Sequence, residues 1–117
     1  MKITPRTKIL PSWVKLREED EDAPSYLLRP LTELDLNDIR PHITVTDTEI
    51  AFKSEGLVLV LKATLRGWKN LTDESGMEII MPRSAREQAE ILPISELYDI
   101  AYHALTSSRV DDTDVKK

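Results

Sequence analysis

The chain of 117 residues contains no cysteine, only three glycines, and few aromatic residues: two tryptophans, three tyrosines and one phenylalanine. Without cysteine the chain can form no disulfide framework, thiolate nucleophile or Cys-bound zinc site. Its glycines, Gly56, Gly67 and Gly76, lie too far apart for either glycine-rich type of phosphate-binding loop. The longest unbroken apolar run, residues 57–61, is far shorter than the roughly 20 residues that span a bilayer.

The N-terminal stretch, MKITPRTKILPSWVK, also lacks an apolar segment long enough for a secretory signal, and Pro5 and Pro11 interrupt it. The absence of cysteine fits a reducing cytoplasm. A chain of this length has enough apolar residues for one core but not for two. We therefore predict a soluble protein with a single domain.

The charge of the chain is acidic, with sixteen Lys and Arg against twenty-one Asp and Glu and a net charge of −5. This balance argues against a nucleic-acid-binding protein, which needs a basic face to displace counterions from phosphates. Five consecutive acidic residues, 18–22, predict an exposed, solvated loop. The alternative is a docking site for a basic partner or a divalent cation, although consecutive carboxylates are unlike the spaced ligands of a calcium loop.

No pattern of catalytic or metal-binding residues is visible. His42 and His103 are far apart, and neither stands in an HxxxH or HExxH motif. His103 is expected on the polar side of the last helix, where a surface hydrogen bond to Asp99, four residues earlier, is possible. No serine lies in a nucleophile elbow, and no carboxylate pair is marked by an apolar setting. We predict that the protein is not an enzyme and assign no catalytic, cofactor-binding or metal-binding residue; partner-binding residues are not identifiable.

The first half of the chain predicts short strands around one helix. Residues 1–12 read as an irregular, flexible arm, and residues 13–16 and 26–28 as strands that pair as a hairpin across the acidic segment. Pro30 lacks an amide donor and therefore ends the second strand or places it at an edge. Thr32 and Asp35 have capping-box spacing and predict a short helix that ends at Pro41.

Residues 43–46 and 49–52 are prone to form strands and predict a second hairpin, around Asp47 and Thr48. A longer helix is the alternative, because Thr46 and Glu49 also have capping-box spacing; we prefer the strands. Ser54 is the expected N-cap of a helix that ends at Arg66, with Gly67 supplying the left-handed residue after it. Its stripe comprises Leu57, Val58, Leu61 and Leu65.

Leu59, Val60 and Ala63 widen the apolar surface of this helix beyond one face, which predicts a central core helix or one that also meets another subunit. Trp68 is expected to cover the core where the helix ends, or otherwise to anchor a partner. Residues 70–76 are dense in turn formers, and residues 77–81 predict a short apolar strand.

The last part of the chain predicts two helices. Ser84 and Glu87 form a capping box for a helix to about Leu92, and Pro93 begins the next. The apolar stripe of that final helix comprises Ile94, Leu97, Tyr98, Ala101, Ala104 and Leu105, with Glu96, Asp99 and His103 on its polar side. Residues 110–117 are polar and predict a flexible tail. The expected fold is α+β, with β-hairpins first, a mainly helical second half, and one domain over residues 13–109.

Four motifs, in this order, resemble those of the tail assembly chaperones of long-tailed, siphophage-type bacteriophages and prophages. The resemblance covers roughly residues 11–109. The motifs are Trp13-Val14-Lys15-Leu16-Arg17 before an acidic segment, Tyr26-Leu27-Leu28-Arg29-Pro30-Leu31-Thr32, Gly67-Trp68-Lys69-Asn70 followed by the turn Asp73-Glu74-Ser75-Gly76, and the Leu92-Pro93 break before an amphipathic helix.

The resemblance implies a non-enzymatic factor in virion morphogenesis that binds the tape measure protein, a very long helical chain with apolar stretches. Such a chaperone keeps its partner soluble in the host cytoplasm until tail tube subunits polymerise, and it is absent from the mature virion. Self-association into a ring or spiral would suit an acidic coat around an apolar helix. The family motifs assign no individual contact to the tape measure protein.

The family is also often made in two lengths by a −1 ribosomal frameshift, and the longer form is a possible partner of the tail tube protein. The terminal Lys116 and Lys117 match A-rich slippery codons. A gene that has neither a slippery run nor an overlapping downstream frame would exclude this hypothesis. Two alternatives remain: a structural virion component, such as a connector or tail-completion protein, and a small acidic regulator that binds a basic protein through residues 18–22.

Overall fold

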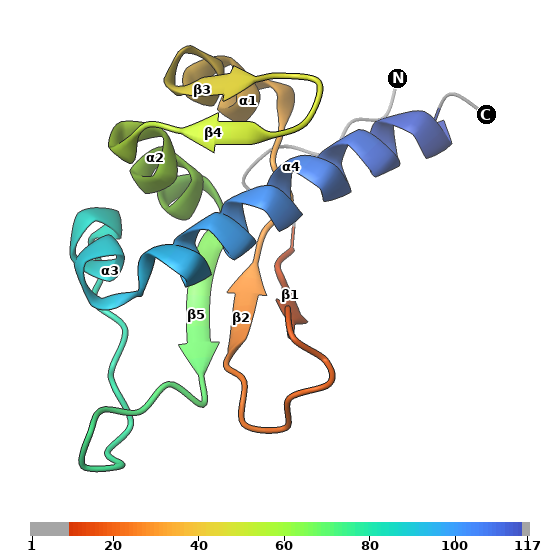
Figure 1. Cartoon of the computed structure of the whole chain (residues 1–117). Coiled ribbons are helices and arrows are strands. Elements are labelled where there is room, and N and C mark those ends of the chain that lie inside the picture. Colours follow the sequence, from red (N-terminus) through yellow and green to blue (C-terminus); the bar gives the residue numbers. More distant parts are fainter. Residues whose placement is uncertain (1–9, 116–117) are drawn as a thin grey trace.

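A three-stranded antiparallel sheet, with a long helix crossing in front of it, forms the centre of the structure (Figure 1). The computed structural model describes the backbone of residues 10–115 and the side chains of residues 10–107. The sheet has the order β1 (Ser12–Val14), β2 (Ser25–Leu28) and β5 (Leu65–Lys69). Strands occupy mainly the first half and helices the second, so the predicted α+β class is confirmed.

The first hairpin joins β1 to β2, with Trp13 opposite Leu27 and Val14 opposite Tyr26. The predicted pairing is confirmed, although β1 begins one residue earlier and ends two residues earlier than expected. The acidic residues 18–22 are exposed in the connection. The Asp20 amide donates to the Arg17 carbonyl at 3.1 Å, and the Asp20 carbonyl accepts from the Ala23 amide at 3.1 Å, which forms two turns. The predicted arm, residues 1–12, lies mostly outside the described residues.

Helix α1 (Glu33–Ile39) begins as predicted. Thr32 Oγ1 accepts a hydrogen bond from the Asp35 amide at 3.3 Å, and the Asp35 carboxylate accepts one from the Thr32 amide at 2.9 Å. The 3₁₀ helix η2 (Arg40–His42) includes Pro41 and leads into the second hairpin. The capping box therefore fixes the start of α1, and the proline ends it.

Strands β3 (Ile43–Val45) and β4 (Ile50–Phe52) form the predicted second hairpin. The Thr46 amide donates to the Glu49 carbonyl at 2.9 Å, and the Glu49 amide donates to Thr46 Oγ1 at 3.1 Å. The two residues that had capping-box spacing therefore close a turn. The bond from the Glu49 amide to Thr46 Oγ1 could serve a capping box as well, but the Thr46 amide donates to the Glu49 backbone carbonyl and not to its carboxylate. The hairpin also buries Phe52 in the core.

Helix α2 (Ser54–Thr64) differs from the prediction at both ends. Lys53 is its N-cap and makes no side-chain capping bond, so Ser54 is the first helical residue and not the cap. The helix ends at Thr64, and the next five residues form β5. Its buried residues are Gly56, Leu57, Val60, Leu61 and Thr64. The buried face is therefore rotated from the predicted stripe, which included Val58 and not Val60.

Strand β5 explains why the predicted helix stops early. The edge of β2 that faces away from β1 has backbone N–H and C=O groups that need partners. β5 pairs with this edge, with Trp68 opposite Tyr26 and Leu65 opposite Leu28. Gly67 lies in this strand opposite Leu27, so its predicted role as a left-handed helix cap is wrong. Among the described residues the positive φ angles belong to Asn70, at 64°, and Gly76, at 86°. Tertiary pairing has overridden the local helical pattern.

The segment from Asn70 to Ser84 contains the predicted turn but not the predicted strand. Asp73 Oδ1 accepts hydrogen bonds from the Ser75 amide at 2.9 Å and the Met77 amide at 3.1 Å, and Gly76 adopts its positive φ. Residues 77–81 contribute a single bridge, between Thr72 and Glu78. Backbone bonds from the Asp73 amide to the Met77 carbonyl, at 2.9 Å, and from the Ile79 amide to the Leu71 carbonyl, at 2.8 Å, also hold this segment. The Trp68 indole adds a bond from its Nε1 to the Ile79 carbonyl at 2.7 Å.

Helix α3 (Ala85–Ile91) begins at the predicted N-cap, where Ser84 accepts from the Glu87 amide, and ends one residue before the expected Leu92. Helix α4 (Ile94–Val115) follows Pro93 and includes most of the segment 110–117, whose flexibility stays a prediction. Its buried face is Leu97, Ile100, Ala101, Ala104 and Leu105. Ile94 is instead largely exposed and Tyr98 half-buried, which corrects the predicted stripe.

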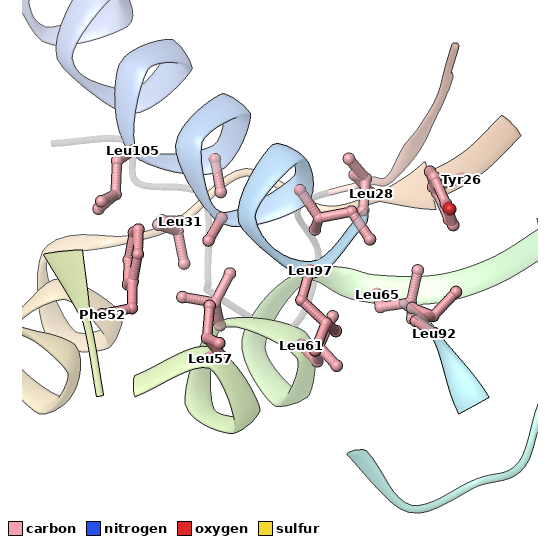
Figure 2. Close-up of a cluster of buried hydrophobic side chains, with 14 of the residues drawn as sticks. Tyr26, Leu28, Leu31, Phe52, Leu57, Leu61, Leu65, Leu92, Leu97 and Leu105 are labelled. Atoms are coloured by element: carbon pink, nitrogen blue, oxygen red, sulfur yellow. The ribbon is translucent and has the colours of Figure 1, made fainter. Parts of the chain in front are cut away.

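One hydrophobic core joins the sheet to the helices. Figure 2 shows Leu97 of α4 close to Leu61 of α2, with Tyr26, Leu28 and Leu65 of the sheet on one side and Leu31, Phe52 and Leu57 on the other. Thr64 is fully buried but satisfied, because its hydroxyl donates to the Val60 carbonyl at 2.7 Å. Within the described residues no helix is long and apolar enough to cross a membrane.

Candidate functional site

A polar network links the first hairpin to α4. Glu96 is buried, with Oε1 accepting from the Tyr26 hydroxyl at 2.8 Å and Oε2 accepting from Arg17 at 2.5 Å. Arg17 also contacts Asp99 at 3.2 Å. Burial raises the pKa of Tyr26 far above its usual value, and the Glu96 carboxylate raises it further. Tyr26 therefore stays a protonated donor, and Glu96 is a structural anchor whose two oxygens are both engaged.

The sequence placed Glu96 on the polar side of the last helix, and this expectation is wrong. Its two partners stand 70 and 79 residues away in the chain, so no local pattern marks the contact. A buried carboxylate needs a donor or a cation to offset its desolvation. The α4 register turns Glu96 toward the sheet, where Tyr26 supplies that donor.

His103 and Ser107 make a second contact that the sequence did not predict. Ser107 Oγ lies 3.3 Å from His103 Nε2, and burial lowers the pKa of the half-buried imidazole. A hydroxyl beside a neutral imidazole is one part of a catalytic triad, in which the imidazole is the base and the hydroxyl the nucleophile. A triad also requires a third group that orients the imidazole ring. The Asp99 carboxylate, one turn earlier, contacts Arg17, and the predicted hydrogen bond between Asp99 and His103 is not among the contacts of the described residues.

Arg29 is the centre of a third polar group. Its Nε donates to the Ala63 carbonyl at 3.0 Å, its Nη2 contacts the Asp35 carboxylate at 2.8 Å, and its amide donates to the Thr64 carbonyl at 2.8 Å. Arg66 also donates to the Ala63 carbonyl, at 3.1 Å. Two guanidinium groups therefore satisfy the C-terminal carbonyls of α2, where the helix dipole favours cations.

These contacts explain the Arg29-Pro30-Leu31-Thr32 motif physically. Arg29 ties β2 to α2 and α1, Pro30 stands two residues after the end of β2, Leu31 is buried in the core, and Thr32 caps α1. A pocket of about 300 Å³ lies beside Arg29 between α1 and α2. Cationic Arg29, Lys62 and Arg66 line it together with anionic Asp35 and Asp38.

The Gly67-Trp68-Lys69-Asn70 motif is also structural. Trp68 is buried, as the core interpretation predicted, and its indole holds the following loop. Asn70 donates from Nδ2 to the carbonyls of Asp22, at 2.9 Å, and Ala23, at 3.2 Å. On the sheet face opposite Trp68, the Lys69 ammonium lies 4.3 Å from the centre of the Trp13 ring, a cation–π contact. Asn70 thus joins the two long loops at one end of the sheet.

Residues of α2, α3 and the start of α4 line a groove. Figure 1 shows these three helices next to one another. The groove has a volume of about 210 Å³, and we call it the α2–α3–α4 groove. Leu57 and Leu97 are its buried apolar residues, Val58 and Ala89 are half-buried, and Ile94 is 62% exposed at the first turn of α4. Ile91 is 39% exposed on α3, just before the turn that contains Pro93. Apolar side chains thus continue from the core to the surface at this point.

The remaining residues considered from the sequence are not brought together. His42 is half-buried beside Gly56, remote in the chain from His103, and the acidic residues 18–22 are exposed in their loop. Within the described residues no three His, Cys, Asp or Glu side chains are grouped so that they could hold a metal ion. Among the features above, the α2–α3–α4 groove is the one that exposes apolar side chains at the surface.

Comparisons with known protein families, with curated proteins and with solved structures found no match to this chain.

Proposed function

We propose that this protein is a tail assembly chaperone that binds the tape measure protein of a siphophage-type tail. The observation that carries the proposal is the order of four motifs along residues 11–109 of one acidic domain. Two of them, around Arg29 and Trp68, lie on the neighbouring strands β2 and β5 and hold the loops and helices that follow. These contacts give two of the four motifs a structural role in this chain.

The surface chemistry is compatible with such a role. A long helix with apolar stretches aggregates when it is alone, and a partner must cover those stretches and add solubility. This chain offers an apolar groove at its surface and carries a net charge of −5. Under the proposal it acts without catalysis in the host cytoplasm, associates with copies of itself around the partner, and is released before the virion is complete.

Co-expression with the tape measure protein encoded beside it tests the function directly. The expected result is a tape measure protein that is soluble and co-purifies only when this chain is present. An insoluble tape measure protein, with this chain eluting alone and with a frameshifted long form also supplied, would contradict the proposal. Mass spectrometry of purified virions then separates a chaperone, which is missing from the particles, from a structural virion component, which is retained.

A further inference from the structure

The pocket beside Arg29, between α1 and α2, has a volume of about 300 Å³, and we call it the α1–α2 pocket. Its apolar residues are Ile39 of α1 and Leu59 and Ala63 of α2. Five charged residues complete the lining: Arg29, Asp35, Asp38, Lys62 and Arg66. The volume lies at the lower end of the range of roughly 300–1,000 Å³ that is typical of small-molecule pockets. The pocket is therefore large enough for a small ligand, and its charges determine which kind of ligand it favours.

The lining of the α1–α2 pocket has three cations and two carboxylates, which leaves a surplus of one positive charge. Arg29 and Asp35 form an ion pair at 2.8 Å. Exposed Lys62 and Arg66 then stand against exposed Asp38, and none of these three forms an ion pair within the described part of the chain.

The residues around the pocket do not cancel this surplus. Glu33 and Arg40 are the other charged residues of α1 and its C-cap, and they pair with each other at 3.4 Å. Lys62 is the single charged residue in the stretch 57–64 of α2. The region formed by α1 and the second half of α2 therefore keeps its excess of positive charge.

The C-terminal carbonyls of α2 are partly negative, and donors from the chain already cover those beside the pocket. Arg29 Nε donates to the Ala63 carbonyl at 3.0 Å, and Arg66 donates to the same carbonyl at 3.1 Å and to the Lys62 carbonyl at 3.2 Å. The Lys62 ammonium has no hydrogen-bond partner among the described residues, so its three N–H donors are available to a ligand.

The Arg29 guanidinium adds positive charge that Asp35 does not fully offset. Its Nη1 is buried and has no hydrogen-bond acceptor among the described residues, whereas Nε and Nη2 are both engaged. Burial and then the charge of Arg29 lower the pKa of Arg66, and the opposing effect of the Asp35 carboxylate is smaller. The two guanidinium groups therefore repel each other, and an anion in the pocket would relieve that repulsion.

We propose that the α1–α2 pocket binds a small anion through an oxyanion group, a phosphate or a carboxylate, which is held by Lys62 and Arg66. Lys62 supplies N–H donors, Arg66 supplies a second positive charge, and the buried charge of Arg29 attracts the anion without a direct bond. The Asp38 carboxylate opposes the anion and limits its affinity. This site is separate from the proposed chaperone function, and the anion binds with no tape measure protein present.

Nuclear magnetic resonance titrations of the full chain test the site, with inorganic phosphate and, separately, acetate added at an ionic strength held constant with sodium chloride. The expected result is saturating shifts that are confined to the amides of residues 35–39 and 59–66 and to the Nε–H signals of Arg29 and Arg66. Saturation with both anions assigns any oxyanion to the pocket, and saturation with one of them assigns that group alone. Saturation with neither anion, or shifts spread over lysines and arginines elsewhere, would overturn the proposal.

Two matched lysine variants locate the cation that holds the anion. Lys62 and Lys53 are both exposed, but Lys53 is the N-cap at the other end of α2 and does not line the pocket. Lys62→Gln is expected to weaken binding of the anion that saturates the wild type about fivefold, which is the size of effect of one exposed charge pair, and Lys53→Gln to leave it unchanged. Equal affinities of the two variants would overturn the proposal.

A variant that should gain affinity keeps the test decisive, because misfolding cannot produce tighter binding. Asp38→Asn removes the carboxylate that opposes the anion and is expected to tighten binding about fivefold at neutral pH. Asp47→Asn, the same change at an exposed aspartate in the turn between β3 and β4, is expected to have no effect. An unchanged or weaker affinity of Asp38→Asn would show that the pocket does not hold the anion.

Discussion

At the scale of single residues, the buried polar side chains act as joints between elements that are distant in sequence. Arg29 connects β2 with α1 and α2, and Glu96 connects α4 with Tyr26 and Arg17. Each joint places a charge in a poorly solvated position, where a partner must offset the cost of desolvation. These residues therefore define how the helices are seated on the sheet, and their loss should cost far more than the loss of a surface ion pair.

Two arginines that each contact a carboxylate of α1 make this comparison possible. Arg29 contacts buried Asp35, whereas Arg40 contacts exposed Glu33 at 3.4 Å. Arg29→Ala should lower the free energy of unfolding by about 3 kcal/mol, because a buried carboxylate loses a cation and the Ala63 carbonyl loses a donor. Arg40→Ala should cost at most about 1 kcal/mol. Urea denaturation of the two variants measures the difference, and equal costs would show that Arg29 is not a structural joint.

His103 should make stability depend on pH. Burial lowers the pKa of the folded imidazole below its unfolded value of about 6.5. The unfolded chain then binds the proton more readily, so this contribution is complete above about pH 6.5 and is lost as the pH falls toward the folded pKa. His103→Gln should therefore lose less stability than the wild type when the pH is lowered from about 8 to about 5.

Urea denaturation at the two pH values measures this effect. The comparison at about pH 8, where the imidazole is neutral in both states, separates any packing cost of the substitution from the titration. Parallel loss of stability in the variant and the wild type between the two pH values would contradict the assignment to His103.

At the scale of elements, the boundary between α2 and β5 shows where local pattern and tertiary pairing disagree. The sequence predicts a helix as far as Arg66, because apolar residues continue at helical spacing. β2 offers an unpaired edge to the same residues, and Leu65 and Trp68 are buried when they pair with it. The helix ends at Thr64, and Arg66 returns to donate to the Lys62 and Ala63 carbonyls that the helix leaves open.

The glycines of these two elements should respond in opposite ways to alanine. A Cβ at Gly56 would lie 2.9 Å from the His42 carbonyl oxygen, so Gly56→Ala should push α2 away from η2 and cost about 1–3 kcal/mol. A Cβ at Gly67 would meet Leu27 Cβ at an ordinary 3.5 Å, with no positive φ to strain. Gly67→Ala should therefore be neutral or stabilising by up to about 1 kcal/mol.

Thermal or urea unfolding of both variants measures these effects. The Gly67 result also discriminates between the strand and the predicted helix cap, because alanine in a left-handed cap would cost about 1 kcal/mol. A destabilised Gly67→Ala chain would thus favour the cap over β5.

At the scale of the whole molecule, one core serves the sheet and the helices together. Ile100 of α4 is completely buried in the cluster that contains Tyr26 and Leu28 of β2 and Leu61 of α2. Loops at one end of the sheet are joined through Asn70, and Arg17 joins the first hairpin to α4. Because no element has a core of its own, the protein should unfold as a single cooperative unit.

Ile100→Ala tests this cooperativity. The substitution should lower the free energy of unfolding by about 2–5 kcal/mol, through lost burial and the cavity left behind. Tryptophan fluorescence reports on the sheet, which carries Trp13 and Trp68, and far-ultraviolet circular dichroism reports mainly on the helices. Both signals should shift to the same lower urea midpoint. Separate midpoints would mean that the sheet and the helices are independent units.

The sequence alone determined the features that depend on neighbouring residues. The capping box of Thr32 and Asp35, the cap at Ser84, the turn at Asp73 and the break at Pro93 are all local hydrogen-bond or steric effects, and each is found as predicted. Only the tertiary structure decided that Leu65 begins a strand, that Glu96 faces inward, and that Ile94 stands exposed beside a groove. Those outcomes depend on partners far away in the chain, whose pairing and burial outweigh the local pattern that the sequence displays.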